Sequence, residues 1–404
     1  MLTILKAKRL NGTLIWLIFS IVVLTTISFL NINKPPHSDE RHFVRTINLF
    51  YHNFSLSTLK DYPEITPPLF YYLFALWAKV FGFSLESLRI FNIIIALFSW
   101  QLIFHLYKFV TQNIKHAFLL SLLAIVNPYF IGVSFYVYND NLALLFLLSS
   151  LLAFFKDNVL LMSLFFSLSL LTRQYSIIFP LTINFFSLIT FFFQNKENKK
   201  FIFTPLISFI PLFVLIIIWN GFAPKSGEEF WIVKNRAVYN IDYINAYISF
   251  SSIYAFPLAI YFLFLKGVNK SSLLFAILTA FVLSHFPIKP SLAALAQTNV
   301  LTIGYAHKFL VMLFGYESLL LKIVLFLFLL LGSYVTISLG KNLFWEFKNR
   351  CLNKFSVFPL LWFFFLFIMP FSFQVWEKYL IMILPFYIIA IYSHIKNDKL
   401  FSMA

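Results

Sequence analysis

The sequence predicts an all-α, polytopic membrane protein. Of its 404 residues 61% are hydrophobic and 11% are charged, whereas soluble domains have about 45–50% apolar and about 25% charged residues. No water-soluble fold can bury so large an apolar fraction, so lipid must be much of the solvent. The apolar residues also form runs of helical length, without the alternation of a membrane β-barrel. These observations exclude a soluble enzyme, a nucleic-acid-binding protein and a disordered chain.

Twelve apolar segments are expected to span the membrane as helices. The first follows three basic residues and lacks a small-residue cleavage site, so we interpret it as a retained anchor rather than a cleaved signal peptide. The twelve segments are Thr13–Leu30, Arg89–Tyr107, Ala117–Phe135, Asn141–Phe155, Val159–Leu171, Tyr175–Phe193, Phe201–Trp219, Ile248–Leu265, Ser272–His285, Glu317–Leu339, Phe355–Phe371 and Trp376–His394.

A further apolar segment, Pro67–Phe81, decides the topology of everything after it. If it lies along the outer interface, the inner segments hold 17 of the 31 basic residues and 4 of the 15 acidic ones. This asymmetry is the positive-inside pattern. We therefore predict a juxtamembrane amphipathic helix in a first outer loop, residues 31–88, with both termini cytoplasmic. The whole chain, residues 1–404, is predicted to form one membrane domain.

The first candidate site is an acidic pair that follows the first predicted span. Asp39 and Glu40 are adjacent, and repulsion between their carboxylates can raise one pKa toward that of a general base. The alternative is an ordinary solvated acidic turn, flanked by Arg41 and His42.

Two further charged residues lie at outer ends of predicted spans. Asp140, in the sequence Asn139-Asp140-Asn141, is close to the hydrocarbon, where an ionisable group is costly and a functional role is the default hypothesis. The alternative is an aspartate in a hairpin turn. Arg89 begins the second span, and its alternative role is snorkelling to the interface.

Two cations interrupt the apolar sequence on the outer side. Arg173 and Lys378 could bind a lipid phosphate, or pair with Asp140 and Glu377, whereas the alternative is simple interface anchoring. The single cysteine, Cys351, excludes a cysteine metal cage, and the eight histidines show no metal spacing. A divalent ion held by carboxylates and His42 remains an open possibility.

Taken in order, these motifs resemble a known family. The motifs are Asp39-Glu40, Pro67-Pro68-Leu69-Phe70-Tyr71-Tyr72, Gly82, Leu88-Arg89, Asp140, and Lys378-Tyr379-Leu380 followed by Pro385. The chain resembles GT-C glycosyltransferases of family 39, which include protein O-mannosyltransferases and lipid A aminoarabinose transferase-like proteins. Residues 61–68 and Arg173-Gln174 are also similar to segments of dolichyl-phosphate-glucose α-1,2-glucosyltransferases.

The resemblance implies transfer of a sugar from a polyprenyl-phosphate donor, at the outer or luminal membrane face, to a lipid, glycan or protein acceptor. It implies that Asp39 is the general base of an inverting reaction and that Glu40 and Asp140 position the acceptor or the base. Arg173 and Lys378 would stabilise the departing phosphate, although the family's motif usually carries arginine where Lys378 stands. Arg89, His42 and Glu377 would support the site.

Three other functions stay open on the sequence. A multi-pass transporter or lipid flippase usually shows two related halves and broken helices at the midplane, and no repeat is visible here. A noncatalytic scaffold would tolerate neutralisation of Asp39 or Asp140. A sibling GT-C activity, such as polymerisation or ligation of O-antigen, differs only in its acceptor. The expected location is a bacterial or archaeal plasma membrane, with the endoplasmic reticulum as the alternative.

Overall fold

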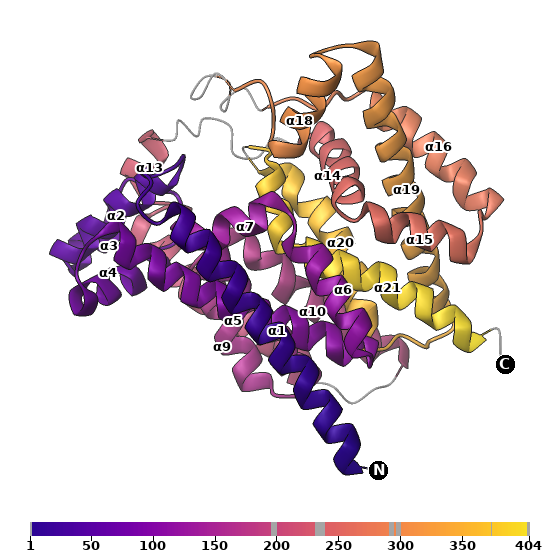
Figure 1. Cartoon of the computed structure of the whole chain (residues 1–404), viewed down its shortest axis with the longest axis horizontal. Coiled ribbons are helices and arrows are strands. Elements are labelled where there is room, and N and C mark those ends of the chain that lie inside the picture. Colours follow the sequence, from indigo (N-terminus) through magenta and orange to yellow (C-terminus); the bar gives the residue numbers. More distant parts are fainter. Residues whose placement is uncertain are drawn as a thin grey trace. The chain divides into compact units, whose positions relative to one another are not determined.

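The computed structural model describes residues 2–194, 200–230, 239–290, 295, 300–372 and 374–401, and within these ranges every regular element is a helix (Figure 1). The elements are α1 (Leu2–Asn31), α2 (Glu40–His52), α3 (Leu56–Lys60), α4 (Leu69–Phe81), α5 (Leu85–Thr111), α6 (Ile114–Ile125), α7 (Pro128–Phe135), α8 (Asn139–Phe155), α9 (Val159–Leu170), η1 (Gln174–Ile177), α10 (Ile178–Gln194), α11 (Lys200–Ile207), α12 (Ile210–Trp219), α13 (Lys225–Phe230), α14 (Ile241–Tyr254), α15 (Phe256–Lys266), α16 (Lys270–Ser284), α18 (Tyr305–Phe314), α19 (Leu319–Lys348), η2 (Lys354–Ser356), α20 (Val357–Ile368), η3 (Met369–Phe371), η4 (Glu377–Met382) and α21 (Leu384–Phe401).

All twelve predicted spans fall on helices, but fewer are long enough to cross a bilayer. Among the described residues, five helices satisfy length and apolarity, and two bent pairs raise the number to seven. The pairs are α6 with α7, bent by 78°, and α14 with α15, bent by 82°. The all-α membrane fold is therefore confirmed, whereas the number of twelve spans stays a prediction.

The chain divides into two compact units. The first comprises Met1–Asn184 and Lys199–Ile232, and the second comprises Phe185–Asn198 and Val233–Ala404. The boundary falls inside α10, which begins in the first unit and ends in the second. The prediction of a single domain stays a prediction.

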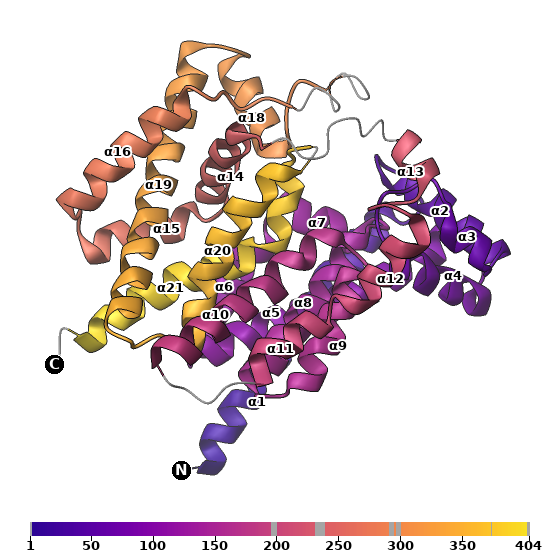
Figure 2. The ribbon, with the colours of Figure 1, turned by 180° about the vertical axis from the view of Figure 1, so that it is seen from behind.

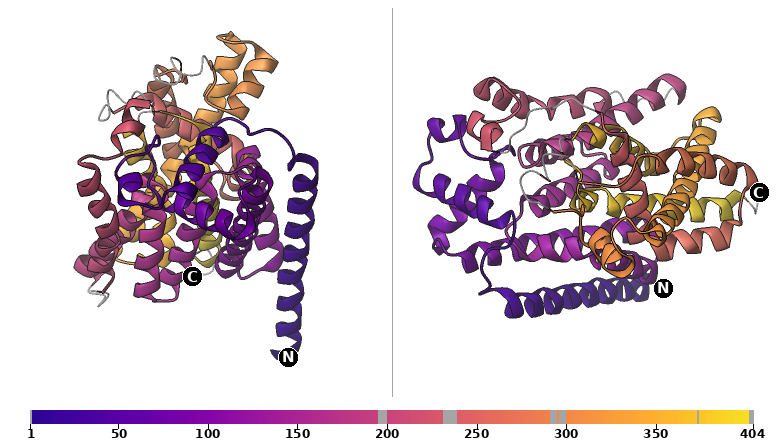
Figure 3. Two further views of the ribbon diagram at one scale, coloured as in Figure 1. Left: turned by 90° about the vertical axis from the view of Figure 1, so that its left-hand side faces the viewer. Right: turned by 90° about the horizontal axis from the view of Figure 1, so that it is seen from above.

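In the first unit, α5 is the central helix and packs against α1, α6 and α8. The indole of Trp16 on α1 stacks on Phe104 and donates to the carbonyl of Trp100 at 3.1 Å. Figure 3 shows α1 as one long helix, and its exposed side chains, such as Ile18 and Val22, are apolar. Such a surface is expected of a lipid-facing helix.

Two short helices in the same unit pack on α9. Helices α11 and α12 run beside α9 (Figure 2), where Leu170, Phe209 and Leu212 form a small apolar cluster. The hydroxyl of Ser167 donates to the carbonyl of Ser208 at 3.2 Å, at the break between α11 and α12. This hydrogen bond satisfies a carbonyl that the broken helix cannot.

The predicted juxtamembrane segment is a helix, α4, that begins after Pro68 and ends at Gly82, whose φ of 90° suits only glycine well. Helix α4 packs against α2 through aromatic rings: Phe43 lies edge-on to Phe70, and Phe50 stacks on Tyr71. These contacts fix the segment that follows the acidic pair.

In the second unit, α14 and α16 pack on α19. The approach is close at Gly332 of α19, where an added Cβ would lie 2.5 Å from the carbonyl oxygen of Ile248. Helix α21 packs on α20 through the rings of Tyr387 and Trp362, whose centroids are 4.4 Å apart.

Candidate active site

The first feature of the site is a buried ion pair between Arg89, at the start of α5, and Glu40, at the start of α2. Arg89 Nε donates to Glu40 Oε1 at 2.9 Å, and Arg89 Nη2 donates to Glu40 Oε2 at 2.7 Å. Both side chains have 0% relative exposure. Such a fork-shaped contact is the strongest geometry of an arginine–carboxylate pair.

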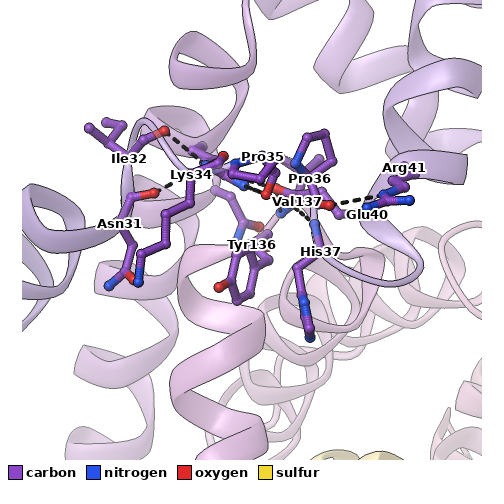
Figure 4. A network of polar contacts seen from close by, with 12 residues as sticks. Asn31, Ile32, Lys34, Pro35, Pro36, His37, Glu40, Arg41, Tyr136 and Val137 are labelled. Atoms are coloured by element: carbon purple, nitrogen blue, oxygen red, sulfur yellow. Dashed lines mark hydrogen bonds and ion pairs between the residues drawn. The ribbon is translucent and has the colours of Figure 1, made fainter.

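The remaining donors of Arg89 bind the backbone of the loop that leads to the acidic pair. Nη1 donates to the carbonyls of Asn31, Ile32 and Lys34, at 3.2, 2.8 and 2.7 Å. Figure 4 shows Asn31 and Ile32 on one side of this network and Glu40 on the other. One guanidinium group therefore holds the whole turn between α1 and α2.

The carboxylate of Glu40 accepts four hydrogen bonds in all. Besides its bonds from Arg89, it accepts hydrogen bonds from the backbone N–H groups of His37 and Val137, both at 3.0 Å. A carboxylate with four donors and no exposure has little capacity left to take a proton from a substrate. This geometry favours a positioning role for Glu40.

Asp39, its neighbour, lies in a different environment. It precedes the first residue of α2 and is half-buried, and Ser38 Oγ lies 3.4 Å from its Oδ1. Ser38 adopts a φ of 51°, in the left-handed region that a serine rarely occupies. His42 is half-buried in the first turn of α2. Its backbone N–H donates to the backbone carbonyl of Asp39 at 3.0 Å.

A second cluster forms around Asp140, in the first turn of α8. Its carboxylate has 0% exposure, accepts a hydrogen bond from Arg173 Nη2 at 2.6 Å, and also accepts one from the hydroxyl of Tyr175. The guanidinium of Arg173 lies 5.2 Å from the ring centre of Tyr175. Asp140 thus lies at the N-terminus of α8, the positive end of the helix dipole.

Backbone hydrogen bonds join these clusters within the first unit. Val137, which binds Glu40, is three residues before Asp140. On the other side of the cluster, Leu69 N donates to the carbonyl of Leu171 at 3.0 Å, and the side chain of Gln174 donates to the carbonyl of Ile65. The structure thus brings Asp39, Glu40, Arg89, Asp140 and Arg173 into one connected region.

Lys378 and Glu377 belong to the second unit. The carboxylate of Glu377 accepts hydrogen bonds from the N–H groups of Ala306 and His307, at 3.0 and 2.7 Å, and one from the hydroxyl of Tyr254. Lys378 is half-buried, with Nζ 5.9 Å from the ring centre of Tyr379. Glu377 therefore caps α18 and does not pair with a cation through any of these contacts.

Comparison with known families agrees with the residues assembled here. Residues 65–219 match the family model described as dolichyl-phosphate-mannose-protein mannosyltransferase. This part of the chain is similar to that family. The matched segment contains α4, Arg89, Asp140 and Arg173, so it agrees with the resemblance to GT-C glycosyltransferases that the sequence predicts.

Two crystal structures of ArnT from Cupriavidus metallidurans are also similar to this chain. The alignment with the apo structure covers 94% of this chain and 75% of the ArnT chain, with 11% identity and a TM-score of 0.43. The structure bound to undecaprenyl phosphate covers 95% of this chain and 77% of its own, with 13% identity and a TM-score of 0.41. No curated protein sequence gives a significant match.

The sequence did not indicate two polar side chains of the candidate site. One is Tyr175, which contacts Asp140 through its hydroxyl and Arg173 through its ring. The other is Asn139, which is fully buried and whose amide nitrogen and oxygen find no hydrogen-bond partner in the described part of the chain. Their positions next to Asp140 and Arg173 were the available signal.

Among the described residues, no three histidine, cysteine, aspartate or glutamate side chains gather where they could hold a metal ion. In the candidate site, Glu40 is engaged by Arg89 and Asp140 by Arg173. Each of these carboxylates would have to leave its arginine before it could bind a cation.

Proposed function

We propose that this protein is a GT-C glycosyltransferase that moves a sugar from a polyprenyl-phosphate donor to an acceptor hydroxyl at the outer membrane face. The matched family is described by a dolichyl-phosphate-linked mannose donor, and dolichol is a polyprenol. The excess of basic residues in the inner segments supports an outer location for Asp39 and Asp140, with both termini in the cytoplasm. A bacterial or archaeal plasma membrane fits this arrangement, and the whole chain would act as one membrane domain.

The observation that carries the proposal is the contrast between Asp39 and Glu40. Glu40 is buried and accepts four hydrogen bonds, whereas Asp39 is half-buried at the end of the same clamped loop. Asp39 is then the general base. It takes the proton from the acceptor hydroxyl as that oxygen bonds to the anomeric carbon, and the bond from this carbon to the phosphate oxygen breaks with inversion.

Charge on the departing polyprenyl phosphate must be stabilised. Arg173 supplies a guanidinium held in place by Asp140 and Tyr175. Lys378, in the second unit, stays the second cation that the sequence predicts for this role. Fixed positive charge aimed at developing negative charge is usually the largest catalytic contribution of such a site. Arg89 and Glu40 act through the loop that they hold, and His42 and Glu377 support the elements next to the reactants.

Asn139 supports an acceptor site beside Asp140. Buried polar groups are almost always hydrogen-bonded, and the amide of Asn139 offers one donor group and one acceptor that have no partner among the described residues. A substrate hydroxyl would satisfy both. We assign Asn139 and Asp140 to acceptor positioning.

The test is transfer from a panel of radiolabelled polyprenyl-phosphate sugars, in vesicles that contain the purified full chain and a native lipid and glycan extract. We expect one donor to be consumed, with release of polyprenyl phosphate. The label should appear in an acceptor, attached through an anomeric carbon of inverted configuration. Retained configuration would contradict the mechanism. Consumption of no donor, with movement of a labelled lipid across the bilayer, would contradict the function.

A further inference from the structure

Helix α18 carries an apolar face with nothing packed on it in the described part of the chain. Phe309, Met312 and Leu313 are 60%, 75% and 58% exposed. Their spacing of three and four residues places them on one side of the helix. The opposite side is buried through His307 and Leu310, so α18 rests on the second unit by one face only.

Helix α18 packs beside a long apolar helix, α19, that also exposes apolar side chains. Helix α19 follows α18 after a short turn, the two pack together, and Figure 1 shows them side by side. Leu319, Leu320 and Ile323, at the start of α19, are 74%, 52% and 46% exposed, and α19 is among the helices long and apolar enough to cross a membrane. An apolar surface of this kind on a spanning helix faces lipid, and α18 packs directly against this helix.

The N-terminus of α18 is bonded to the residue before Lys378. The Glu377 carboxylate accepts from the N–H groups of Ala306 and His307, and its own N–H donates to the carbonyl of Ile303 at 3.0 Å. The Tyr254 hydroxyl, at the end of α14, fixes the same carboxylate. Movement of α18 toward or away from the bilayer centre would therefore move Glu377, and with it Lys378.

We propose that α18 is an interfacial helix whose Phe309, Met312 and Leu313 face lies in the outer leaflet, and that through Glu377 it sets the depth of Lys378. The partner of this surface is the lipid bilayer itself. Lys308, exposed on the same helix, can extend to the headgroups while the apolar side chains enter the acyl boundary. The consequence for donor binding rests on the proposed function, in which Lys378 stabilises the donor phosphate.

The lipid contact is tested without any measurement of activity. A nitroxide label is placed at Met312→Cys in a Cys351→Ser background, and the full chain is reconstituted in vesicles of phosphatidylethanolamine and phosphatidylglycerol. Matched labels go to exposed Glu229→Cys on α13 and exposed Phe264→Cys on α15. We expect the ratio of oxygen to nickel-chelate accessibility at 312 to be at least threefold above that at 229 and below that at 264.

Two results would overturn the lipid contact. A ratio at 312 equal to that at 229 would place α18 in water. Low accessibility to both oxygen and nickel would show that the face is covered by protein, such as a second copy of the chain. Neither result depends on the transfer reaction.

The link to Lys378 is tested with Glu377→Ala and with the milder Tyr254→Phe, which keeps the packing of the ring. We expect both variants to raise nickel accessibility at 312 at least twofold and to raise the KM for the polyprenyl-phosphate donor at least fivefold, with kcat within twofold. Glu317→Gln, an exposed carboxylate just after α18, is the control and should change neither quantity. An unchanged label with a raised KM would contradict the mechanical link, and a moved label with an unchanged KM would contradict the role of depth.

Discussion

Arg89 and Glu40 are 49 positions apart in the sequence and form a doubly hydrogen-bonded ion pair with no exposed surface on either side chain. The aromatic rings of Phe135 and Tyr136 lie 5.2 and 5.3 Å from the Arg89 guanidinium. The pair therefore joins four segments, namely the end of α1, the start of α2, the start of α5 and the segment before α8. It fixes the backbone on which Asp39 stands.

Loss of one partner of this pair should be costly, because the other charge stays buried without compensation. We expect Arg89→Ala or Glu40→Ala to lower the free energy of unfolding by about 3–5 kcal/mol, measured by reversible unfolding in mixed micelles. The free energy of unfolding of Arg89→Lys should lie between those of the alanine variants and wild type, because lysine keeps the charge but cannot form the two-pronged contact. The double variant Arg89→Met/Glu40→Gln should lower the free energy of unfolding by less than the sum of the decreases in the two single variants. A loss below about 1 kcal/mol in either single variant, the level of an exposed pair, would contradict the buried pair.

Tyr175 should affect transfer through Arg173 rather than through folding. Tyr175→Phe keeps the ring against Arg173 but removes the hydroxyl that donates to Asp140. We expect kcat/KM for the donor to fall about tenfold, the equivalent of one charge-assisted hydrogen bond of about 1.4 kcal/mol. Tyr72→Phe on α4 removes a half-buried hydroxyl without touching this cluster and is the control. Equal activities of the two variants would refute the role of Tyr175.

Gly227 should not tolerate a side chain. An added Cβ would lie 2.4 Å from the carbonyl oxygen of Glu64, so the segment after α3 would have to move away from α13. We expect Gly227→Ala to destabilise the protein by about 1–3 kcal/mol, as other overpacked sites do. Gly221→Ala is the matched control, since its nearest atom would be a flexible Glu228 oxygen at 3.6 Å. Equal midpoints of thermal inactivation for the two variants would argue against this contact.

The attachment of α18 should depend on pH through His307. Burial lowers the pKa of His307 to about 4, so the unfolded state, with a pKa of about 6.5, binds more protons between these values. Stability should therefore fall as the pH falls from about 6.5 to about 4, by up to about 3 kcal/mol. His307→Asn should flatten this slope in unfolding experiments across that pH range, whereas exposed His285→Asn should leave it as in wild type. A wild-type slope in the His307 variant would contradict the assignment.

The sequence predicted the helical segments and the charged residues at their ends, because both depend on local composition. It missed the bends, although their signals were present. Ala117–Phe135 was expected to be one span, but it breaks at Pro128, which lacks an N–H, and Asn127 caps the new helix. The second bend, at Ala255, lies two residues before Pro257.

The pairing of side chains was harder to predict than their presence. Arg89 was expected to support the site, but its hydrogen bonds to the loop carbonyls depend on how α5 meets the turn after α1, which is a tertiary property. Arg173 was given either a lipid phosphate or Asp140 as its partner, and the structure shows the contact with Asp140. For Asn139 the sequence offered only its position next to Asp140, and its burial without a hydrogen-bond partner among the described residues is visible only in the structure.

The most direct test of the central claim is the transfer rate of Asp39→Asn at saturating donor and acceptor, with matched protein levels in vesicles. Asparagine keeps the size of the side chain but cannot take a proton, so kcat should fall by at least about 100-fold, the usual contribution of a general base. Glu229→Gln, which neutralises an exposed carboxylate elsewhere in the first unit, should keep the wild-type rate. A rate of Asp39→Asn within about twofold of wild type, far from the loss expected of a missing base, would show that Asp39 is not the base.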